Sequence, residues 1–332
     1  MAKYQEIARI LRQRLERGEY PDGKLPPLRK LAASMGVSYL TARQAVQTFK
    51  ETGGHKAAAP HPFVAVITPL WAFTAWHRAI RNQTRELGGL VRFVSYCSDT
   101  DPVIYDTLNQ EEYDLIILFP PEGEDARLHE LICKDRERIV VMFHDFTQYG
   151  VRSLKGADPL CIERFLEILK ERGVSRIDAI GRDIDLTSIL IENYRVWREW
   201  LDRNGMDGQF FSVKHYSFES DEAMAADYCR GILAGKKLSR AVFCLLPEMA
   251  VGLYRACHEF GLTPGRDISI FSFGSESKAK LMTPALATVV DIDVPLTVRK
   301  MLTEYCPGAK RSDKLIFQPE LTDIFLGESL VP

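Results

Sequence analysis

The chain has 332 residues, of which 46% are hydrophobic and 27% are charged, and its formal net charge is −2. That length is enough for two or three domains with substantial cores. No apolar run is long enough to span a bilayer, and the charged N-terminus lacks the unbroken apolar core of a signal peptide. We therefore expect a cytoplasmic protein with no membrane partner.

The charge is distributed unevenly along the chain. Residues 1–56 carry eleven basic and five acidic side chains, a balance of +6. The remaining residues carry 32 basic and 40 acidic side chains, a balance of −8. A basic head on an acidic body indicates that the head meets a polyanion and that the body does not.

Three short segments of the head have the residue pattern of helices. Apolar side chains recur at helical spacing from residue 4 to residue 15. Pro26 and Pro27 suit the start of the second helix, where the missing N–H of proline costs nothing. Gly36 can take the left-handed conformation of a sharp turn, and Ser38 is a good N-cap for the third helix. The expected inward positions of that helix are Leu40, Ala45, Val46 and Phe49.

This order of pieces predicts a helix-turn-helix, whose second helix enters the major groove of DNA. Arg43 could bond a guanine edge with two hydrogen bonds or clamp a phosphate. A small helical bundle with a solvated basic face is the alternative interpretation. The candidate DNA-binding residues are Arg29 and Lys30, facing the phosphate backbone, and Ser38, Tyr39, Thr41 and Arg43 on the third helix.

A set of residues between positions 4 and 53 has a specific spacing. They are Tyr4-Gln5-Glu6-Ile7, Gly18-Glu19-Tyr20-Pro21, Lys24-Leu25-Pro26, Arg29, Leu31-Ala32, Gly36-Val37-Ser38, Thr41, Arg43, Ala45 and Gly53. With them, the head resembles the DNA-binding domain of GntR-family regulators. The resemblance implies that Arg29, Ser38, Tyr39, Thr41 and Arg43 occupy the DNA-contacting positions of that family.

The head departs from the family in two places. Pro27 and Leu28 stand where the family usually has Ser and Glu. After the glycine at position 53, the family continues into a basic β-hairpin, the wing, which touches the minor groove. Here residues 54–62 form an Ala/Pro linker with no strand pattern, so we expect the wing to be missing and carry over no wing contacts.

From Phe63 onward, strand patterns alternate with helix patterns. This alternation predicts an α/β fold with two parallel sheets side by side, covered by helices. Ligands of such folds bind in the cleft at the carboxyl ends of the strands. The expected strands are 63–68, 91–96, 114–119, 139–143, 176–180, 210–213, 241–244 and 268–273, and the expected helices are 75–87, 102–109, 128–133, 159–172, 187–204, 222–234 and 248–260.

The segment 241–290 carries a second resemblance. Its specific residues are Phe243-Cys244, Glu248-Met249-Ala250, Gly252, Gly261-Leu262, Pro264, Asp267-Ile268-Ser269, Phe273, Pro284-Ala285-Leu286 and Thr288-Val289. The body is similar to the effector-binding domain of LacI/GalR-family regulators, a two-subdomain fold related to periplasmic sugar-binding proteins. A GntR-type head on such a body is the architecture of the AraR type of repressor. The expected domains are therefore 1–53, a (winged-)helix-turn-helix head, 54–62, a linker, and 63–332, an effector-binding and dimerisation domain.

The ligand positions of this second family are altered. Leu246-Pro247 and Gly274-Ser275 stand where polar pairs are usual, and Leu190 or Ile191 replaces an arginine. Because the usual polar groups bind sugar hydroxyls, a cleft without them should reject sugars. We therefore expect a different, less polar effector, or none.

Candidate effector-binding residues follow the predicted strands. Phe73 and Trp76 could stack on a ring of the ligand, and packing in the core or in a dimer is an equal alternative for each. The other candidates are Tyr96, Asp145, Asp183 and Asp291, each at a predicted strand end, with His144 and Arg182 beside them.

Catalysis and metal binding have little support. The motifs GxSxG, GxxxxGK[ST] and GxGxxG are absent, and His144-Asp145 is a lone pair with no nucleophile nearby in the sequence. The seven histidines show no metal-ligand spacing. The seven cysteines are scattered and never form CxxC, which predicts reduced thiols packed in the interior. We expect no catalytic residue, no metal and no cofactor.

Together these features predict a DNA-binding transcription regulator that represses as a homodimer on a pseudo-palindromic operator. A small-molecule effector in the cleft would shift the separation of the two heads. Two alternatives stay open: a ligand-sensing protein that has lost DNA binding, and an α/β enzyme.

Overall fold

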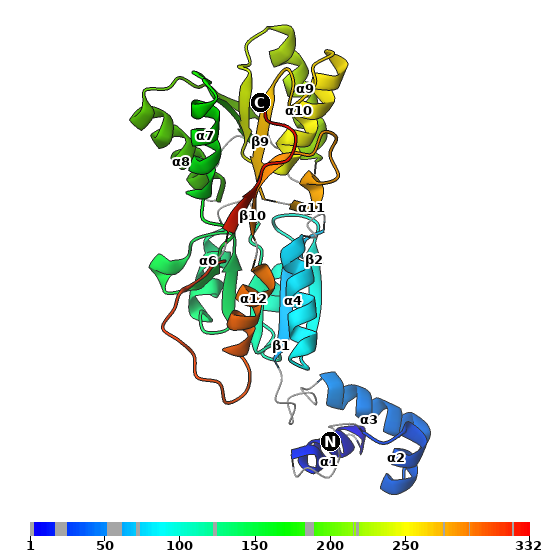
Figure 1. Ribbon diagram of the computed structural model, residues 1–332. Helices are drawn as coiled ribbons and strands as arrows, with labels where there is room; N and C mark the ends of the chain where they lie inside the picture. Colours follow the sequence, from blue (N-terminus) through cyan, green and yellow to red (C-terminus); the bar gives the residue numbers. More distant parts are fainter. Residues whose placement is uncertain are drawn as a thin grey trace.

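The structure is a computed structural model that describes a defined set of residues. These are 3–16, 25–51, 62–70, 74–121, 125–182, 189–214, 216, 219–274, 276–291, 293–320 and 322–332. Figure 1 shows a small helical head and a larger body of two lobes, each built on one sheet.

The head consists of α1 (Lys3–Glu16), α2 (Leu28–Met35) and α3 (Tyr39–Glu51). Gly36 ends α2 with φ 61° and ψ 38°, the left-handed conformation that glycine adopts without strain. The N–H of Val37 then donates to the carbonyl of Ala32 at 3.0 Å, which closes the turn before α3. The three helices share one apolar core, made of Ile7, Ala8, Leu11, Leu31, Ala45 and Phe49. The predicted helix-turn-helix is confirmed.

One predicted inward position of α3 is wrong. Leu40 is 72% exposed, whereas Ala42, which the pattern did not select, is fully buried together with Ala45. Small side chains at these two positions allow α3 to approach its neighbours closely, and a leucine at position 42 would be too large for that contact. The predicted linker 54–62, and with it the missing wing, lies almost wholly outside the described residues, which resume at Pro62.

The first lobe is built on a six-stranded sheet of order β11-β5-β4-β3-β1-β2, in which all strand pairs are parallel. Helices α4 (Ala75–Glu86) and α12 (Val294–Thr303) cover one face, and α5 (Pro102–Leu108) and α6 (Ala126–Lys134) cover the other. The strands are β1 (Phe63–Pro69), β2 (Leu90–Tyr96), β3 (Leu115–Leu118), β4 (Ile139–Met142), β5 (Arg152–Leu154) and β11 (Ile316–Phe317).

The second lobe is built on a sheet of order β12-β10-β9-β8-β6-β7. Its pairs are parallel except for β10 and the edge strand β12, which are antiparallel. Helices α7 (Cys161–Glu171) and α8 (Ile189–Asn204) cover one face, and α9 (Asp221–Ala234) and α10 (Pro247–Glu259) cover the other. The strands are β6 (Asp178–Arg182), β7 (Phe210–Val213), β8 (Ala241–Cys244), β9 (Ser269–Phe273), β10 (Ala287–Asp291) and β12 (Thr322–Phe325).

The chain passes between the lobes three times. It leaves the first lobe after β5, returns after β10 to form α12 and β11, and leaves again after β11 to form β12. Each passage starts at the carboxyl end of a strand. The carboxyl edges of both sheets therefore lie at the junction of the lobes, which Figure 1 shows between β10 and α12.

A buried ion pair holds the returning segment in the first lobe. Arg152 of β5 donates to Glu304, just after α12, at 2.8 Å, and both side chains are largely shielded from solvent. Glu304 also accepts from the hydroxyl and the N–H of Ser312, at 2.7 and 3.1 Å. Because both carboxylate oxygens have partners, the charge is compensated and the segment that leads to β11 is fixed in place.

The cysteines are free thiols, as predicted, but their burial varies. Cys229, Cys244 and Cys257 are buried in the second lobe, and burial raises the pKa of the Cys229 and Cys257 thiols to about 12. Cys97 after β2 is exposed, which corrects the prediction that all the thiols pack in the interior.

Candidate DNA interface and effector site

The N-terminus of α3 is capped by Ser38. Its Oγ accepts from the N–H of Thr41 at 3.1 Å and lies 2.9 Å from the Thr41 hydroxyl. The cap satisfies one of the unpaired N–H groups at the helix end and fixes both hydroxyls at the start of α3. The partial positive charge of a helix N-terminus also favours phosphate groups, so this end of α3 suits contact with DNA.

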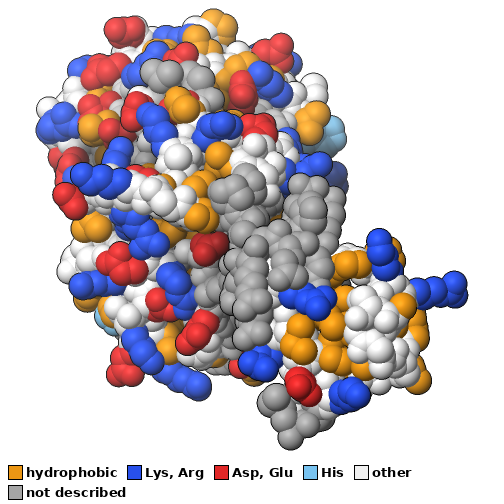
Figure 2. All heavy atoms as spheres, turned by 90° about the horizontal axis from the view of Figure 1, so that it is seen from below, with side chains coloured by type: hydrophobic (Ala, Val, Ile, Leu, Met, Phe, Trp, Pro, Cys, Tyr) orange, Lys and Arg blue, Asp and Glu red, His pale blue; other side chains and the backbone are white. Residues whose placement is uncertain are grey.

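Both helices of the helix-turn-helix carry exposed basic side chains. Arg29 and Lys30 are exposed on α2, and Arg43 is exposed one turn into α3. Within the described part of the chain, these three side chains form no ion pair, so they can neutralise phosphates. Tyr39 is 48% exposed beside them. Figure 2 shows Lys and Arg side chains standing out from the head, with apolar side chains between them.

Aromatic rings lie at the carboxyl edge of the first sheet. Phe119 follows β3, Phe143 follows β4, and their ring centroids are 5.6 Å apart in an edge-to-face arrangement. Trp76, in the first turn of α4, meets Phe143 in the same way at 5.8 Å. Phe143 has φ 62°, a conformation that costs free energy in a residue other than glycine. This edge of the first lobe is therefore apolar and aromatic.

A buried histidine supports the aromatic edge. His77 of α4 is fully buried, and its ring lies nearly parallel to that of Phe119, 6.4 Å away. Its Nδ1 accepts from the N–H of Thr74 at 3.1 Å, so the proton of the neutral ring is on Nε2, which lies 2.9 Å from the Thr68 hydroxyl. Burial lowers the pKa of His77 to about 4, and the ring is neutral at pH 7.

The carboxyl edge of the second sheet combines apolar and polar side chains. Leu246, which follows β8, is half-buried and packs against the cores on both faces of the sheet. Asn193 of α8 is fully buried, and its Nδ2 donates to the Leu245 carbonyl at 3.5 Å. Its Oδ1 has no hydrogen-bond partner among the residues that the structure describes. Arg182, at the end of β6, lies 3.9 Å from the Asp221 carboxylate. An unpaired buried acceptor is costly and calls for a donor.

The predicted effector residues have different environments. Trp76 is only 5% exposed, and Tyr96 is buried with its hydroxyl donating to the Phe119 carbonyl at 3.1 Å, so both support the aromatic edge from beneath. Asp145 is half-exposed and accepts from Lys155 at 2.6 Å. Burial alone would raise its pKa, but hydrogen bonds from Lys155 and Thr147 lower it to about 2.

Three further candidates lie wholly or partly outside the described residues. Phe73 and Asp183 lie outside the described residues. Asp291 pairs with Thr322 through its backbone, and its side chain is outside the described part of the chain. The sequence pattern overlooked Phe119 and Phe143, although each is the last residue of a predicted strand. It gave no signal for Asn193, which is in the middle of a predicted helix.

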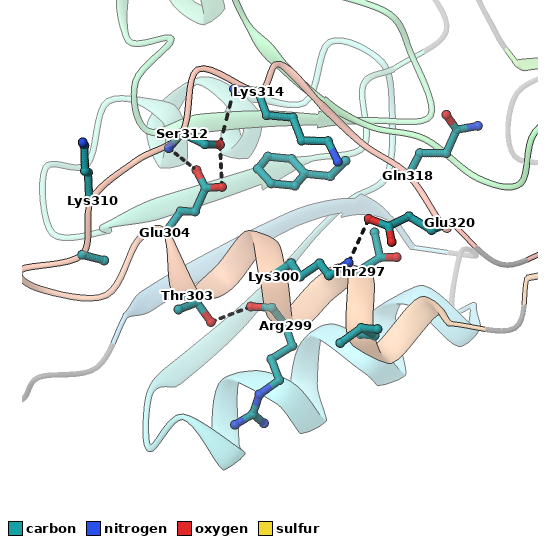
Figure 3. A pocket seen from close by; sticks show the side chains of 13 residues that line it. Thr297, Arg299, Lys300, Thr303, Glu304, Lys310, Ser312, Lys314, Gln318 and Glu320 are labelled. Atoms are coloured by element: carbon teal, nitrogen blue, oxygen red, sulfur yellow. Dashed lines mark hydrogen bonds and ion pairs between the residues drawn. The ribbon is translucent and has the colours of Figure 1, made fainter.

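An open hollow of about 670 Å³ lies elsewhere, between α12 and the segment 309–320. Figure 3 shows Lys300 pointing toward Glu320, and Glu304 toward Ser312. These polar groups pair with one another across the hollow, and Arg299 binds Glu86 of α4. The hollow therefore belongs to the flank of the first lobe and does not include the aromatic edge.

Neither a metal centre nor a membrane span is evident in the described residues. No group of three or more His, Cys, Asp or Glu side chains among them is arranged to hold a metal ion. None of the helices described above combines the length and the apolar character needed to cross a membrane.

Comparisons with known proteins agree with this division into head and body. Residues 3–53 match the model of the gntR family of bacterial regulatory proteins, and residues 166–316 match a periplasmic binding protein-like domain. The search of curated proteins returned no match.

Solved structures resemble the body. A LacI family transcriptional regulator from Bifidobacterium animalis subsp. lactis has a TM-score of 0.67 and 13% identity, covering 81% of this chain and 98% of its own. A LacI family regulator from Arthrobacter sp. FB24 in complex with lactose has a TM-score of 0.64 and 17% identity, covering 81% and 99%. A dimeric Lac repressor with an 11-residue C-terminal deletion has a TM-score of 0.65 and 16% identity, covering 81% and 98%.

The head, its exposed basic residues and the family match define the chain as a DNA-binding transcription regulator. It joins a GntR-family helix-turn-helix domain to a periplasmic-binding-protein-like domain with the fold of LacI-family regulators. These domains are those of regulators and not of enzymes, which agrees with the prediction from the motif search.

Proposed function

We propose that the protein is a repressor that acts as a homodimer in the cytoplasm and releases its operator in response to a small molecule. The observation that carries this proposal is the capped, basic N-terminus of α3, displayed on a head that is joined to a two-lobed body. In the proposed division, residues 1–53 bind DNA, residues 54–62 link, and residues 63–332 dimerise and bind the effector.

One short helix contacts only a few base pairs, so a specific operator requires two heads, which a dimer provides. Two heads on a two-fold axis would contact half-sites about one helical turn apart. One of the solved structures that resemble the body is described as dimeric, which supports the same arrangement here. Arg29 and Lys30 would bind phosphates, and Ser38, Tyr39, Thr41 and Arg43 would lie in or beside the major groove.

We further propose that the effector is less polar than a sugar and carries an aromatic or other apolar ring. Phe119 and Phe143 line the first-lobe edge, with Trp76 behind them, and Leu246 lies at the second-lobe edge. The proposed site also includes Phe73, Asp183 and Asp291, which follow predicted strands of the two lobes. The Oδ1 of Asn193, which has no partner within the described part of the chain, suits a hydrogen-bond donor on such a ligand.

Two experiments test these proposals separately. In the first, the full chain selects duplexes from a random library, and Arg43→Ala is compared with Arg255→Ala, a matched exposed arginine on α10. We expect Arg43→Ala to lose operator binding and remain a dimer in sedimentation, whereas Arg255→Ala binds like the parent. If the parent retains no duplex, the protein is a ligand sensor that has lost DNA binding.

In the second experiment, a thermal-shift screen compares aromatic and apolar compounds with sugars. Any compound that binds the folded state raises the melting temperature with its concentration. We expect hits among the ring compounds, and those hits should release the selected operator. Stabilisation by sugars alone would contradict the proposed effector class without affecting the DNA-binding proposal.

A further inference from the structure

One of the exposed residues of α3, the recognition helix, is a large apolar one. Leu40 is 72% exposed in the first turn of α3. Successive residues of a helix are turned by about 100°, so Leu40 lies on the side opposite Ala42, Ala45 and Phe49, which fill the core. Single exposed leucines are ordinary on protein surfaces, so its position on the molecule is what matters here.

That position is the DNA-facing side of the head. Ser38 and Tyr39 precede Leu40, and Arg43 follows three residues later on the same side of the helix. All of them stand at the N-terminal end of the helix that enters the major groove, where side chains reach base edges. Leu40 has no hydrogen-bonding group and cannot bind a phosphate, so its partner in the groove must be apolar.

The major groove offers one apolar group on its base edges, the C5 methyl of thymine. We propose that Leu40 selects thymine at one position of each half-site by packing against that methyl group. This inference rests on the DNA-binding function and adds to it one base of the operator. Cytosine presents an amino donor and no methyl in the same groove, and Leu40 would leave that donor without a partner.

The size of the effect follows from the burial of one methyl group. Burying one such carbon is worth about 0.8 kcal/mol, which corresponds to about a fourfold change in Kd. A symmetric operator contains the contact twice, so removing both methyl groups should weaken binding about 15-fold.

Deoxyuridine removes the methyl group and leaves base pairing unchanged. The parent first selects its operator from a random library, and synthetic duplexes then carry deoxyuridine in place of each thymine, one symmetric pair at a time. We expect one pair of substitutions to weaken the parent about 15-fold. The Leu40→Ala variant should bind the thymine duplex about as weakly as the parent binds that deoxyuridine duplex, and it should not respond to the same substitution.

Leu281→Ala is the matched control, because Leu281 is 86% exposed and follows α11 (Glu276–Ala279) in the body. It should keep the affinity and the deoxyuridine response of the parent. The inference is overturned if no thymine position responds in the parent, or if Leu40→Ala responds like the parent. A Leu40→Ala variant that loses its dimer in sedimentation would overturn it too, because Leu40 would then contact protein. A parent that selects no duplex would overturn the DNA-binding function itself.

Discussion

The Nε2 atom of His77 lies 2.9 Å from the Oγ1 atom of Thr68, at the carboxyl end of β1. The Nδ1 atom of the same ring accepts from Thr74, the residue before α4. Neither nitrogen can take another proton without breaking a bond, and the ring is buried. One neutral histidine therefore joins the sheet to the start of α4 beneath the aromatic edge.

This histidine should make the body sensitive to acid. Its pKa falls from 6.5 to about 4 on folding, so between these values the unfolded state binds a proton that the folded state does not. The stabilisation is complete above pH 6.5 and is lost as the pH falls to 4, a difference on the order of 3 kcal/mol. Urea denaturation at pH 7 and pH 4.5 measures it. His77→Gln should flatten this dependence, and a variant that keeps the dependence of the parent would contradict the role of His77.

Ser38 should have two separable roles. Ser38→Ala removes the acceptor for the Thr41 N–H and should destabilise the head by about 1 kcal/mol. Ser38→Asp keeps an acceptor at the cap but adds a negative charge where phosphates would lie. We expect Ser38→Asp to preserve the helicity and melting temperature of the head and to weaken DNA binding strongly. If it binds DNA as well as the parent, the N-terminus of α3 does not approach the phosphate backbone.

The basic residues of α2 should contribute through salt-dependent contacts. Each phosphate neutralised by a basic side chain adds about 0.9 to the slope of log K against log salt concentration. Replacing Arg29 and Lys30 by alanine should therefore lower the slope by about 1.8 per head, with little change in the preferred sequence. Binding titrations across a salt series measure the slope. The control replaces Arg127 and Lys134, on α6 of the body, by alanine. If this control lowers the slope as much as the α2 substitutions do, Arg29 and Lys30 are not the residues that contact phosphates.

Substitutions at Phe143 should change both the stability of the protein and its binding of ring compounds. Its φ of 62° strains any side chain larger than that of glycine. Phe143→Gly and Phe143→Ala both remove the ring, but the glycine variant should be more stable than the alanine variant by about 1 kcal/mol. Both should lose the response to ring compounds. Lys236→Gly, at a second position of positive φ, should relieve strain and keep that response.

Much of the α/β order could be predicted from the sequence because long buried strands and amphipathic helices repeat regularly. Strands β1, β7 and β8 differ from their expected bounds by at most one residue. Strands β5 and β11 have only three and two residues, so no period can develop, and they went unpredicted together with β10 and β12. Their place is decided by contacts with distant strands, which a local pattern does not contain.

For the candidate sites too, the sequence pattern predicts local features and misses those that depend on tertiary packing. Arg29, Ser38 and Arg43 could be assigned because a helix-turn-helix has fixed spacing between its parts. The inward residue in the first turn of α3 could not be assigned, because Leu40 and Ala42 are both apolar and only the closeness of the helices distinguishes them. At the lobe junction, strand ends could be located approximately, but which side chain turns inward depends on tertiary packing.

Strand β11 enters the first sheet from near the end of the chain, beside β5. A ribosome must therefore make most of the second lobe before the first lobe has all its strands. The two lobes cannot be separated by a cut between β5 and α7, since the upstream fragment would lack α12 and an edge strand. Evolution could exchange the head for another DNA-binding module at residues 54–62, but the body must be inherited as one piece.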